Sequence, residues 1–577
     1  MENIEKVRHS LSHILAKAVK ELYPEAALGM GPATENGFYY DFDRIKIGED
    51  DLLKIEERMR EIIKEDISFV KKKKNKEEVL EIFKNEPYKL EIIEDIEKED
   101  GNKNFTVYES GNFIDLCEGP HVKRSKEIPL KSFKLERIAG AYFKGLEKRP
   151  MLKRIYGLAF ASEDELKTYL KNREEAAERD HRKWGARLDL FCFSDLVGPG
   201  FPLFTPRGTI VISELKKKIE EICENYGFQK VLTPHLAKIE LYEKSGHAKK
   251  FSEELFHVSS ENKHEFAIRP VLCPHQTQIY ASKIRSYRDL PIRYMESEKQ
   301  YRAEKPGEVK GLSRVYGITI EDGHCFCTTD QVKDEIKGII AIIKDFYSLF
   351  DLWGNHRTCL SLRDYSHPEN YIGEKEDWDL CEKILGEVAE EMDLDAERQE
   401  GEAAIYGPKI DFMFKDAMDN EIQIPTVQID FATPKRFDLT YIDENGKEQT
   451  PIMVHRAVLG SYERFIALLL EHFNGALPFW LSPEQVRIIP VSEKFSDYAE
   501  KLCQALKKEK IRVTIDREGE TLSKKIRNGE IQKIPYLLVV GEKEKKASSA
   551  SVRYNGNDEG AVSFSNLIER IKKEKEL

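Results

Sequence analysis

Nine cysteines and fourteen histidines give this 577-residue chain its first candidates for chemistry. The cysteines are odd in number and scattered, so we expect reduced thiols that serve as metal ligands or nucleophiles. Cys117 and His121 form a Cys-x-x-x-His pattern, a spacing compatible with a metal site or with a catalytic triad. Arg464 lies in the apolar segment HRAVLGSYERFIALLLE, where a buried guanidinium needs an anion. The residue types therefore predict anion binding together with thiol or imidazole chemistry.

Composition limits the class of protein. Hydrophobic residues make up 40% of the chain and charged residues 34%, with no apolar run near the ~20 residues that cross a bilayer. The opening segment mixes acidic and basic residues, unlike a signal peptide, so we expect a soluble, cytoplasmic protein without a membrane partner. A net charge of -12 does not exclude nucleic acid, because phosphate binding needs only a local basic face. The run from Lys71 to Lys74 is either such a face or simply solvated.

The elements that must position these residues fall into four regions. Residues 1–157 open with an amphipathic helix that ends near Tyr23 and continue with turn-rich, aromatic strands. Residues 158–188 are charged, rich in helix formers and free of proline, which predicts one helix connecting two domains. Residues 189–481 alternate strands and turns around one long helix, and residues 482–577 alternate strands with helices. The pattern predicts an α+β multidomain protein ending in a small α/β domain.

Three segments of the largest region resemble the motifs of class II aminoacyl-tRNA synthetases. Motif 1 is matched by the long helix in TIVISELKKKIEEICENYG and by Pro234 in VLTP. Motif 2, two antiparallel strands joined by a loop, is matched by YMESEKQYRAEKPGEVKGLSRVYG, with Arg302 and Glu304 in its signature. Motif 3 is matched by HRAVLGSYERFIALLLE, with Arg464 near the start of its helix. The resemblance implies an antiparallel-sheet core that activates an amino acid with ATP, and a homodimer formed through motif 1.

The resemblance also assigns the motif residues to ATP. Arg302 is expected to bridge the amino-acid carboxylate and the α-phosphate, where its forked guanidinium aligns both groups and stabilises charge in the transition state. Glu304 is expected to recognise the adenine amino group, Arg314 the phosphates and Arg464 the γ-phosphate. The expected catalytic residues are thus Arg302 and Arg464, and Mg²⁺ is expected to accompany ATP.

Within class II, the chain resembles the threonyl-tRNA synthetases along essentially its whole length. The resemblance implies one Zn²⁺ per chain, held by Cys273 in RPVLCP, His324 in EDGHCFC and His455 in PIMVHRAVLG. Three ligands leave coordination positions open, and threonine can fill them with its amino and hydroxyl groups whereas valine lacks the hydroxyl. The residues expected to bind threonine are Asp322, Tyr406, Lys409 and Gln428.

Serine also has a hydroxyl, so serine is expected to pass this filter. The segments SLSHILAKA and DLCEGPHV resemble an editing domain, shared with alanyl-tRNA synthetases, that hydrolyses seryl-tRNA. Many relatives carry H-x-x-x-H on the opening helix, and we place His13 at its first position and Lys17 at its second. The expected editing residues are His13, Lys17, Asp115, Cys117 and His121.

The C-terminal region resembles the anticodon-binding domain of class IIa synthetases through KIRNGEIQKIPYLLVVGEKE. Glu544 and Arg553 are our candidates for reading anticodon bases of the tRNA, since they offer an acceptor and a forked donor. The small ubiquitin-like domain that commonly precedes the editing domain is expected to be missing, which predicts a shortened form.

Four positions depart from the pattern of the family. They lie around the expected cysteine ligand and in the second strand of motif 2, and they are Val271, Leu272, Ile318 and Ile320. An alternative reading is a non-catalytic tRNA-binding paralogue, but the retained arginines and zinc ligands argue against it. Editing hydrolysis is expected as a second activity beside aminoacylation.

Overall fold

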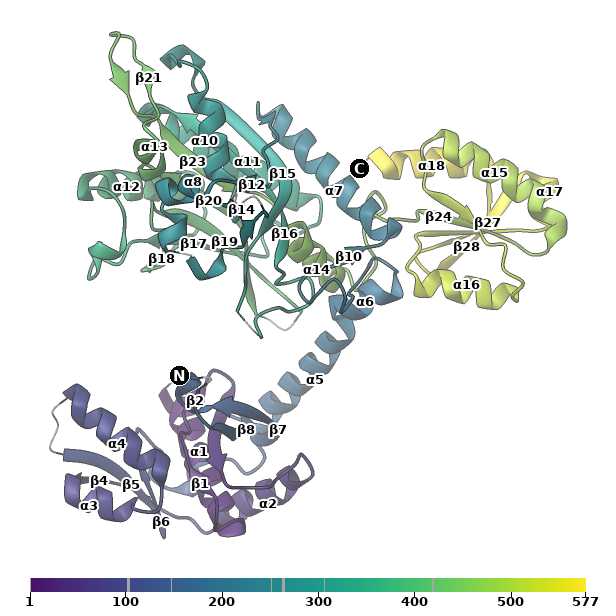
Figure 1. Ribbon diagram of the computed structural model, residues 1–577. Helices are drawn as coiled ribbons and strands as arrows, with labels where there is room; N and C mark the ends of the chain where they lie inside the picture. Colours follow the sequence, from purple (N-terminus) through teal and green to yellow (C-terminus); the bar gives the residue numbers. More distant parts are fainter. Residues whose placement is uncertain are drawn as a thin grey trace. The chain divides into compact units, whose positions relative to one another are not determined.

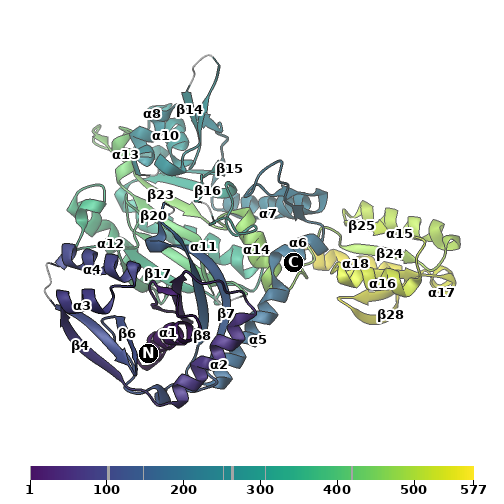
Figure 2. The same ribbon diagram turned by 60° about the horizontal axis from the view of Figure 1, so that its bottom comes forward.

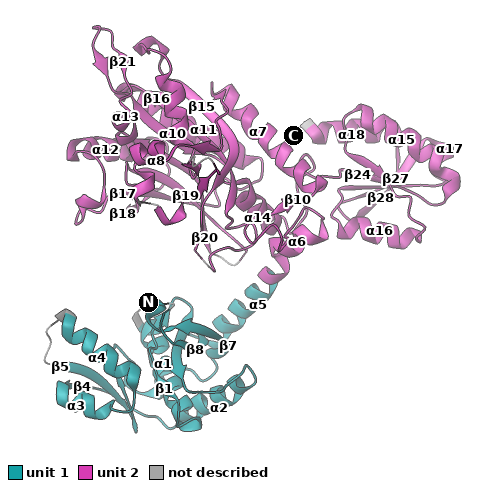
Figure 3. Cartoon of the chain, viewed as in Figure 1, with its two compact units in different colours: residues 1–175 teal, residues 176–577 magenta. Residues whose placement is uncertain are grey.

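The computed structural model describes residues 2–100, 104–146, 148–250, 252–261, 265–305, 307–417 and 420–576. The chain divides into two compact units, Met1–Glu175 and Ala176–Leu577 (Figure 3). Among the described residues, no helix has both the length and the apolar character needed to cross a membrane.

The first unit is built on two antiparallel sheets. One sheet has the order β1-β3-β8-β7, with β2 paired to β3, and the other has the order β4-β5-β6. Helix α1 buries Leu11 and Leu15 in the core beside the first sheet, as the helical spacing predicts. The strands are β1 (Ala27–Leu28), β2 (Ala33–Thr34), β3 (Gly37–Asp43), β4 (Phe69–Asn75), β5 (Asn104–Ser110), β6 (Phe113–Leu116), β7 (Phe133–Tyr142) and β8 (Met151–Ala159). The helices are α1 (Glu2–Leu22), α2 (Asp51–Lys64), α3 (Lys76–Ile82) and α4 (Pro87–Asp100).

The connecting region contains two helices, where the sequence predicted one. Helix α5 (Glu163–Arg179) ends before Asp180, and α6 (His181–Arg187) follows it. The Asp180 side chain accepts a hydrogen bond from the Arg182 amide at 2.7 Å, which caps a new helix. Aspartate favours this cap position, so the break has a local cause in the sequence.

The core of the second unit is an eight-stranded sheet, drawn in teal and green (Figure 1). Its order is β11-β15-β16-β23-β20-β19-β17-β18, antiparallel except for the two edge pairs, which confirms the predicted sheet. Helices α7, α11, α12 and α14 share one hydrophobic core with this sheet. The strands are β11 (Gln229–Lys230), β15 (Ile292–Tyr301), β16 (Gly317–Cys327), β17 (Arg357–Leu362), β18 (Glu397–Glu400), β19 (Lys409–Lys415), β20 (Glu421–Asp430) and β23 (Ile452–Ala457). The helices are α7 (Pro206–Asn225), α11 (Val332–Ser348), α12 (Lys375–Glu391) and α14 (Tyr462–His472).

Smaller elements surround the sheet. The short strands are β9 (Phe191–Cys192), β10 (Leu203–Phe204), β12 (Leu236–Ala237), β13 (His257–Ser259), β14 (Glu265–Ile268), β21 (Tyr441–Ile442) and β22 (Glu448–Gln449). The short helices are α8 (Ile239–Ser245), α9 (His247–Lys250), α10 (Cys273–Ala281) and α13 (Ala432–Arg436). Helix α10 packs on the sheet through a separate cluster that includes Cys273, Tyr280 and Phe326.

The last hundred residues form the predicted α/β domain. Its sheet has the order β25-β24-β26-β27-β28, parallel in the first three strands and antiparallel in the rest. Helices α15 and α18 cover one face and α16 covers the other (Figures 1 and 2). The strands are β24 (Val486–Pro490), β25 (Val513–Ile515), β26 (Tyr536–Val540), β27 (Ser549–Tyr554) and β28 (Asn557–Ser563). The helices are α15 (Ser496–Lys508), α16 (Leu522–Ile531), α17 (Glu542–Ala547) and α18 (Phe564–Glu576).

Candidate active site and histidine cluster

Polar residues from five strands of the core sheet line up in one row. Adjacent members of the row are directly paired across neighbouring strands, and they are Tyr294, His324, His455, Gln428 and Lys409. Side chains alternate between the two faces of a strand, so members of one row project from the same face. Accordingly, Cys325 and Cys327 point into the helical core, whereas Phe326 packs on the opposite side. The row places residues that are far apart in the sequence beside one another.

Two members of this row approach a cysteine on the facing helix. The ligand atoms of Cys273, His324 and His455 all lie within 4.8 Å of one another, and all three residues are buried. Cys273 is the first residue of α10, which packs on this face of the sheet. The structure therefore brings the three predicted zinc ligands together.

Each imidazole of this group is held by one of its two nitrogens. His324 Nδ1 lies 2.8 Å from Gln276 Oε1, and its buried Nε2 has no hydrogen-bond partner among the described residues. His455 Nε2 lies 2.9 Å from Asp430 Oδ2, which leaves Nδ1 as the nitrogen available for a ligand. Metal-binding histidines commonly donate their second N–H to such acceptors. One thiolate and two imidazoles, each with one nitrogen held by an acceptor and the other left for a metal, fit the ligand preferences of Zn²⁺.

The predicted threonine residues lie beside this group. The Tyr406 hydroxyl donates to Gln428 Oε1 at 2.7 Å, and its ring stacks on His455 at 5.0 Å between centroids. Burial raises the pKa of Asp322 to about 7, so a bound ammonium group would restore its charge. Lys409 lies in the row, but its Nζ pairs with Asp411 and is already engaged.

A cavity of about 260 Å³ adjoins the row and is lined by three arginines and one glutamate. The Arg464 Nε donates to the Ser313 carbonyl at 3.1 Å, and Nη1 donates to the Gln423 carbonyl at 3.2 Å. Burial, then repulsion from the other two arginines, lowers the pKa of Arg464. The excess of positive charge suits a polyanion. The charged lining residues are Arg302, Arg314, Arg464 and Glu304.

Arg302 also lines a second cavity of about 350 Å³. Tyr406, Val271 and His247 line that cavity too, so Arg302 faces both the predicted amino-acid side and the arginine cavity. This is the position expected for a side chain that bridges a carboxylate and a phosphate. His247 is a lining residue that the sequence reasoning missed, because nothing in its local pattern distinguishes it.

Arg314, the other arginine of motif 2, forms ion pairs with nearby glutamates. Arg314 contacts Glu304 at 2.7 Å and Glu308 at 2.9 Å, so a nucleotide would have to replace these contacts. Ile318 and Ile320 line the same cavity, which places both departures from the family pattern against the predicted nucleotide.

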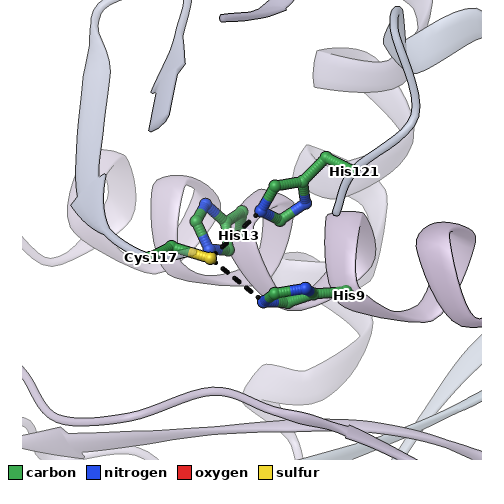
Figure 4. A group of neighbouring side chains, drawn as sticks. All are labelled: His9, His13, Cys117 and His121. Atoms are coloured by element: carbon green, nitrogen blue, oxygen red, sulfur yellow. Dashed lines mark hydrogen bonds between the residues drawn. The ribbon is translucent and has the colours of Figure 1, made fainter. Parts of the chain in front are cut away.

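A second group of side chains gathers in the first unit (Figure 4). The ligand atoms of His9, His13, Cys117 and His121 all lie within 4.8 Å of one another. Cys117 Sγ lies 3.2 Å from His9 Nε2 and 3.3 Å from His121 Nε2. His9 and His13 come from α1, one turn apart, and the other two follow β6.

His9 corrects one sequence prediction. The H-x-x-x-H pattern is formed by His9 and His13, and not by His13 followed by Lys17. Residues four apart share a helix face, so this spacing was a usable signal that we missed. Lys17 is one turn further along, where its Nζ bonds to Glu21 and Asn112. It therefore does not replace a histidine of the cluster.

The histidine cluster is electrically neutral at neutral pH. Burial lowers the pKa of His9, His13 and His121 and raises the pKa of Cys117 to about 11. The result is three neutral imidazoles beside a protonated thiol.

Asp115 lies behind the cluster. Its carboxylate pairs with Lys89 Nζ at 2.6 Å and accepts from the Tyr40 hydroxyl at 2.6 Å. His13 Nε2 lies 3.8 Å away, beyond hydrogen-bond distance. Lys89 and Tyr40 are further buried polar groups that no sequence pattern indicated.

The two predicted anticodon residues are engaged within their own domain. Glu544 accepts from the Gly541 amide and the Ser551 hydroxyl, both at 2.9 Å. Arg553 contacts Glu530 at 3.0 Å and the Gly556 carbonyl at 3.1 Å. These contacts serve the local fold, and an anticodon role stays a prediction.

The motif 1 helix does not expose its apolar side. In α7, Val211, Leu215 and Ile219 are buried in the core of their own chain, so this face gives no reason for a dimer. Exposed apolar side chains lie on either side of this helix in the sequence instead. They are Phe193, Leu196, Val197, Leu203, Leu232 and Leu236, of which Leu196 is 99% exposed and Leu232 78%.

Three family models match the chain. Residues 256–473 match the tRNA synthetase class II core domain (G, H, P, S and T). Residues 485–574 match an anticodon binding domain. Residues 105–156 match the threonyl and alanyl tRNA synthetase second additional domain. The three matches follow the order of the regions predicted from the sequence.

Similar proteins match nearly the whole chain. The threonine–tRNA ligase of Gloeobacter violaceus is 44% identical over 560 residues, covering 96% of this chain and 89% of that protein. The threonine–tRNA ligase of Thermotoga maritima is 43% identical over 573 residues, covering 98% and 87%. A solved structure of the RNA binding domain of threonyl-tRNA synthetase from Cryptosporidium parvum Iowa II superposes with a TM-score of 0.64 at 32% identity. It covers 68% of this chain and 98% of that one.

Proposed function

The chain belongs to the threonine–tRNA ligase family, and we propose that the residues described above carry out the reaction of that family. The protein is an aminoacyl-tRNA synthetase that activates L-threonine with ATP and transfers it to tRNA(Thr). We assign editing to residues 1–157, catalysis to 189–481 and anticodon binding to 482–577, with 158–188 as the connector. The three matched family models, each within one of these regions, support the assignment.

ATP binds in the arginine cavity in this proposal. Arg464 and Arg314 hold the phosphates, Mg²⁺ accompanies them, and Glu304 accepts from the adenine amino group once Arg314 has moved to the nucleotide. Arg302 lines both cavities, so its guanidinium holds the threonine carboxylate against the α-phosphate. As the carboxylate attacks the α-phosphate and the bond to the departing pyrophosphate breaks, negative charge builds on the phosphate oxygens, and a preorganised cation stabilises it.

Threonine binds at the row of the core sheet. Cys273, His324 and His455 would hold Zn²⁺, which when bound supplies a Lewis acid for the amino and hydroxyl groups of threonine. Asp322 would balance the ammonium charge, while Tyr406 and Gln428 line the pocket. The observation that carries the proposal is the unpartnered, buried Nε2 of His324 facing a cysteine and a second histidine.

The experiment combines metal analysis with threonine-dependent exchange of pyrophosphate into ATP. We expect near one zinc per chain, loss of exchange on chelation, and about 10²- to 10³-fold lower exchange in Arg302→Ala. Arg288→Ala is the matched control, because this arginine is exposed and its side chain hydrogen-bonds, among the described residues, to its neighbour Tyr287 alone. Metal-free protein that still activates threonine would contradict the zinc site, and an active Arg302→Ala would contradict the ATP assignment.

The histidine cluster is proposed to hydrolyse seryl-tRNA(Thr). Its imidazoles stay neutral, and His9 is the one proposed to accept a proton from the water that attacks the ester carbonyl, because burial lowers its pKa less far than that of His13 or His121. The Cys117 thiol, protonated at neutral pH, can donate to a developing charge. Serine has the same hydroxyl by which the zinc site would recognise threonine, so mischarged seryl-tRNA is expected to form and the histidine cluster would remove it.

A homodimer and a cytoplasmic location complete the proposal. The exposed apolar side chains around Leu196 and Leu232 support a dimer, because water-exposed apolar patches commonly mark interfaces. All nine cysteines are free thiols, which suits a reducing compartment.

A further inference from the structure

His181, the first residue of α6, joins three parts of the second unit. Its Nδ1 lies 2.7 Å from Glu471 Oε1, at the end of α14. Its Nε2 lies 3.1 Å from the backbone nitrogen of Leu312, in the loop between β15 and β16. The side chain is 4% exposed, so both contacts are shielded from water.

These contacts fix the tautomer of the imidazole. The Leu312 amide is a donor, so Nε2 must be the acceptor and the proton must be on Nδ1, where it is donated to Glu471. A metal site could also be suspected here, because ligand atoms of Asp180, His181 and Glu471 lie within 4.8 Å of one another. Both nitrogens of His181 are occupied, in contrast to His324, so hydrogen bonding accounts for this group without a metal.

The loop residue bound by His181 is adjacent to the arginine cavity. Ser313 and Arg314, the next two residues, line that cavity. The Ser313 carbonyl accepts from Arg464 Nε at 3.1 Å. The His181 imidazole therefore holds Leu312, the residue directly before Ser313, whose carbonyl orients Arg464.

The chain at this point is shaped to approach the histidine. Gly311 has φ +52, and a Cβ built on it would lie 2.4 Å from His181 Nε2. Leu312 is fully buried, so its amide has no water to bind when the histidine acceptor is removed. A glycine and a buried leucine at successive positions thus bring the loop against the imidazole.

We propose that His181 is a positioning residue for ATP: through the Leu312 amide it fixes the loop that places Arg314 and orients Arg464. The connector thereby takes part in the nucleotide site, although its sequence, charged and rich in helix formers, does not indicate such a role. The inference rests on the proposed role of the arginine cavity in binding ATP.

Two isosteric variants separate the contacts of His181. In His181→Asn the amide nitrogen replaces Nδ1 and keeps the bond to Glu471, but the Leu312 amide loses its acceptor. In His181→Gln the amide oxygen replaces Nε2 and keeps the acceptor for Leu312. We expect the asparagine variant to raise KM for ATP about tenfold, equivalent to about 1.4 kcal/mol, with KM for threonine unchanged. The glutamine variant is expected to stay within about threefold of the parent for both substrates.

Trp184→Phe is the matched control on the same helix. The Trp184 indole donates to Asn474 at 3.1 Å, so this variant removes one α6 contact without touching the loop. It should lower thermal stability and leave KM for ATP unchanged.

Equal effects of asparagine and glutamine, or parallel rises in both Michaelis constants, would overturn the proposal. If His181→Asn fails to fold, Gly311→Ala tests the same contact from the other side and should raise KM for ATP alone. Exchange activity that survives Arg464→Ala would instead refute the ATP assignment, whatever the His181 variants do.

Discussion

Asp430 offers the sharpest test of the metal site. Its Oδ1 accepts from the amides of Ala432 and Thr433 at 2.9 and 2.7 Å, and its Oδ2 faces His455 Nε2. In Asp430→Asn, the side-chain oxygen must stay with these two donors, so the new NH₂ group faces His455. A donor opposite Nε2 moves the ring proton to Nδ1, the nitrogen available for the metal.

The magnitude follows from the partner that is lost. Removing the acceptor of a metal-bound histidine typically lowers metal affinity about 10- to 100-fold, or about 1.4 to 2.8 kcal/mol. Asp430 is fully buried, so water cannot restore the lost acceptor and we expect the upper part of this range. The substitution keeps the size of the side chain, so a cavity does not contribute.

The assay is competition for zinc between the protein and a chromophoric chelator, which reports affinity independently of catalysis. Gln276→Glu is the matched control, because a carboxylate there still accepts from His324 Nδ1 and should hold zinc at least as tightly. If Asp430→Asn binds zinc as tightly as the parent protein, His455 does not serve as a ligand through Nδ1 and the reasoning fails.

Three further outcomes are expected. His9→Ala should slow hydrolysis of seryl-tRNA by about 10²- to 10⁴-fold, whereas Lys17→Met should leave the rate unchanged. Deacylation of labelled seryl-tRNA measures both rates. A slow Lys17→Met variant beside an unaffected His9→Ala variant would contradict the assignment of His9 to the cluster. Acidification below about pH 6.5 should destabilise the first unit, because burial lowers the pKa of His13 and His121 and the unfolded chain then binds protons that the folded unit does not. Hydrogen exchange of α1 followed from neutral to acidic pH measures this loss, and unchanged protection would refute it. Leu232→Glu should convert a dimer to a monomer in sedimentation velocity, and a parent protein that already sediments as a monomer would remove the basis for this expectation.

Motifs that are local in the sequence were predictable. The motif 2 hairpin, the α14 helix that carries Arg464 and the alternating C-terminal domain each have a period or a turn that a single segment reveals. The predicted zinc ligands came from resemblance to a family, and their proximity depends on strand register. His324 and His455 are directly opposite because β16 and β23 pair at that residue, which neither segment encodes alone.

Supporting contacts were not predictable for the same reason. Gln276, Asp430 and His181 act on residues far along the chain, and each looks like an ordinary polar side chain in its own segment. Two features could have been predicted, because their signals are local in the sequence. They are the break between α5 and α6 at Asp180 and the four-residue spacing of His9 and His13. An amphipathic helix such as α7 does not reveal in its sequence which surface covers it, and here the core of its own chain covers its apolar face.

The pairing of β15 with β16 restricts which changes of length the gene can accept. The two strands are in register over ten consecutive residue pairs, from Ile292 opposite Phe326 to Tyr301 opposite Gly317, without a shift. Deletion of a single codon between Gly317 and Gly323 would turn every following side chain of β16 to the other face, sending His324 into the helical core. Both strands should therefore evolve by substitution alone, without insertions or deletions.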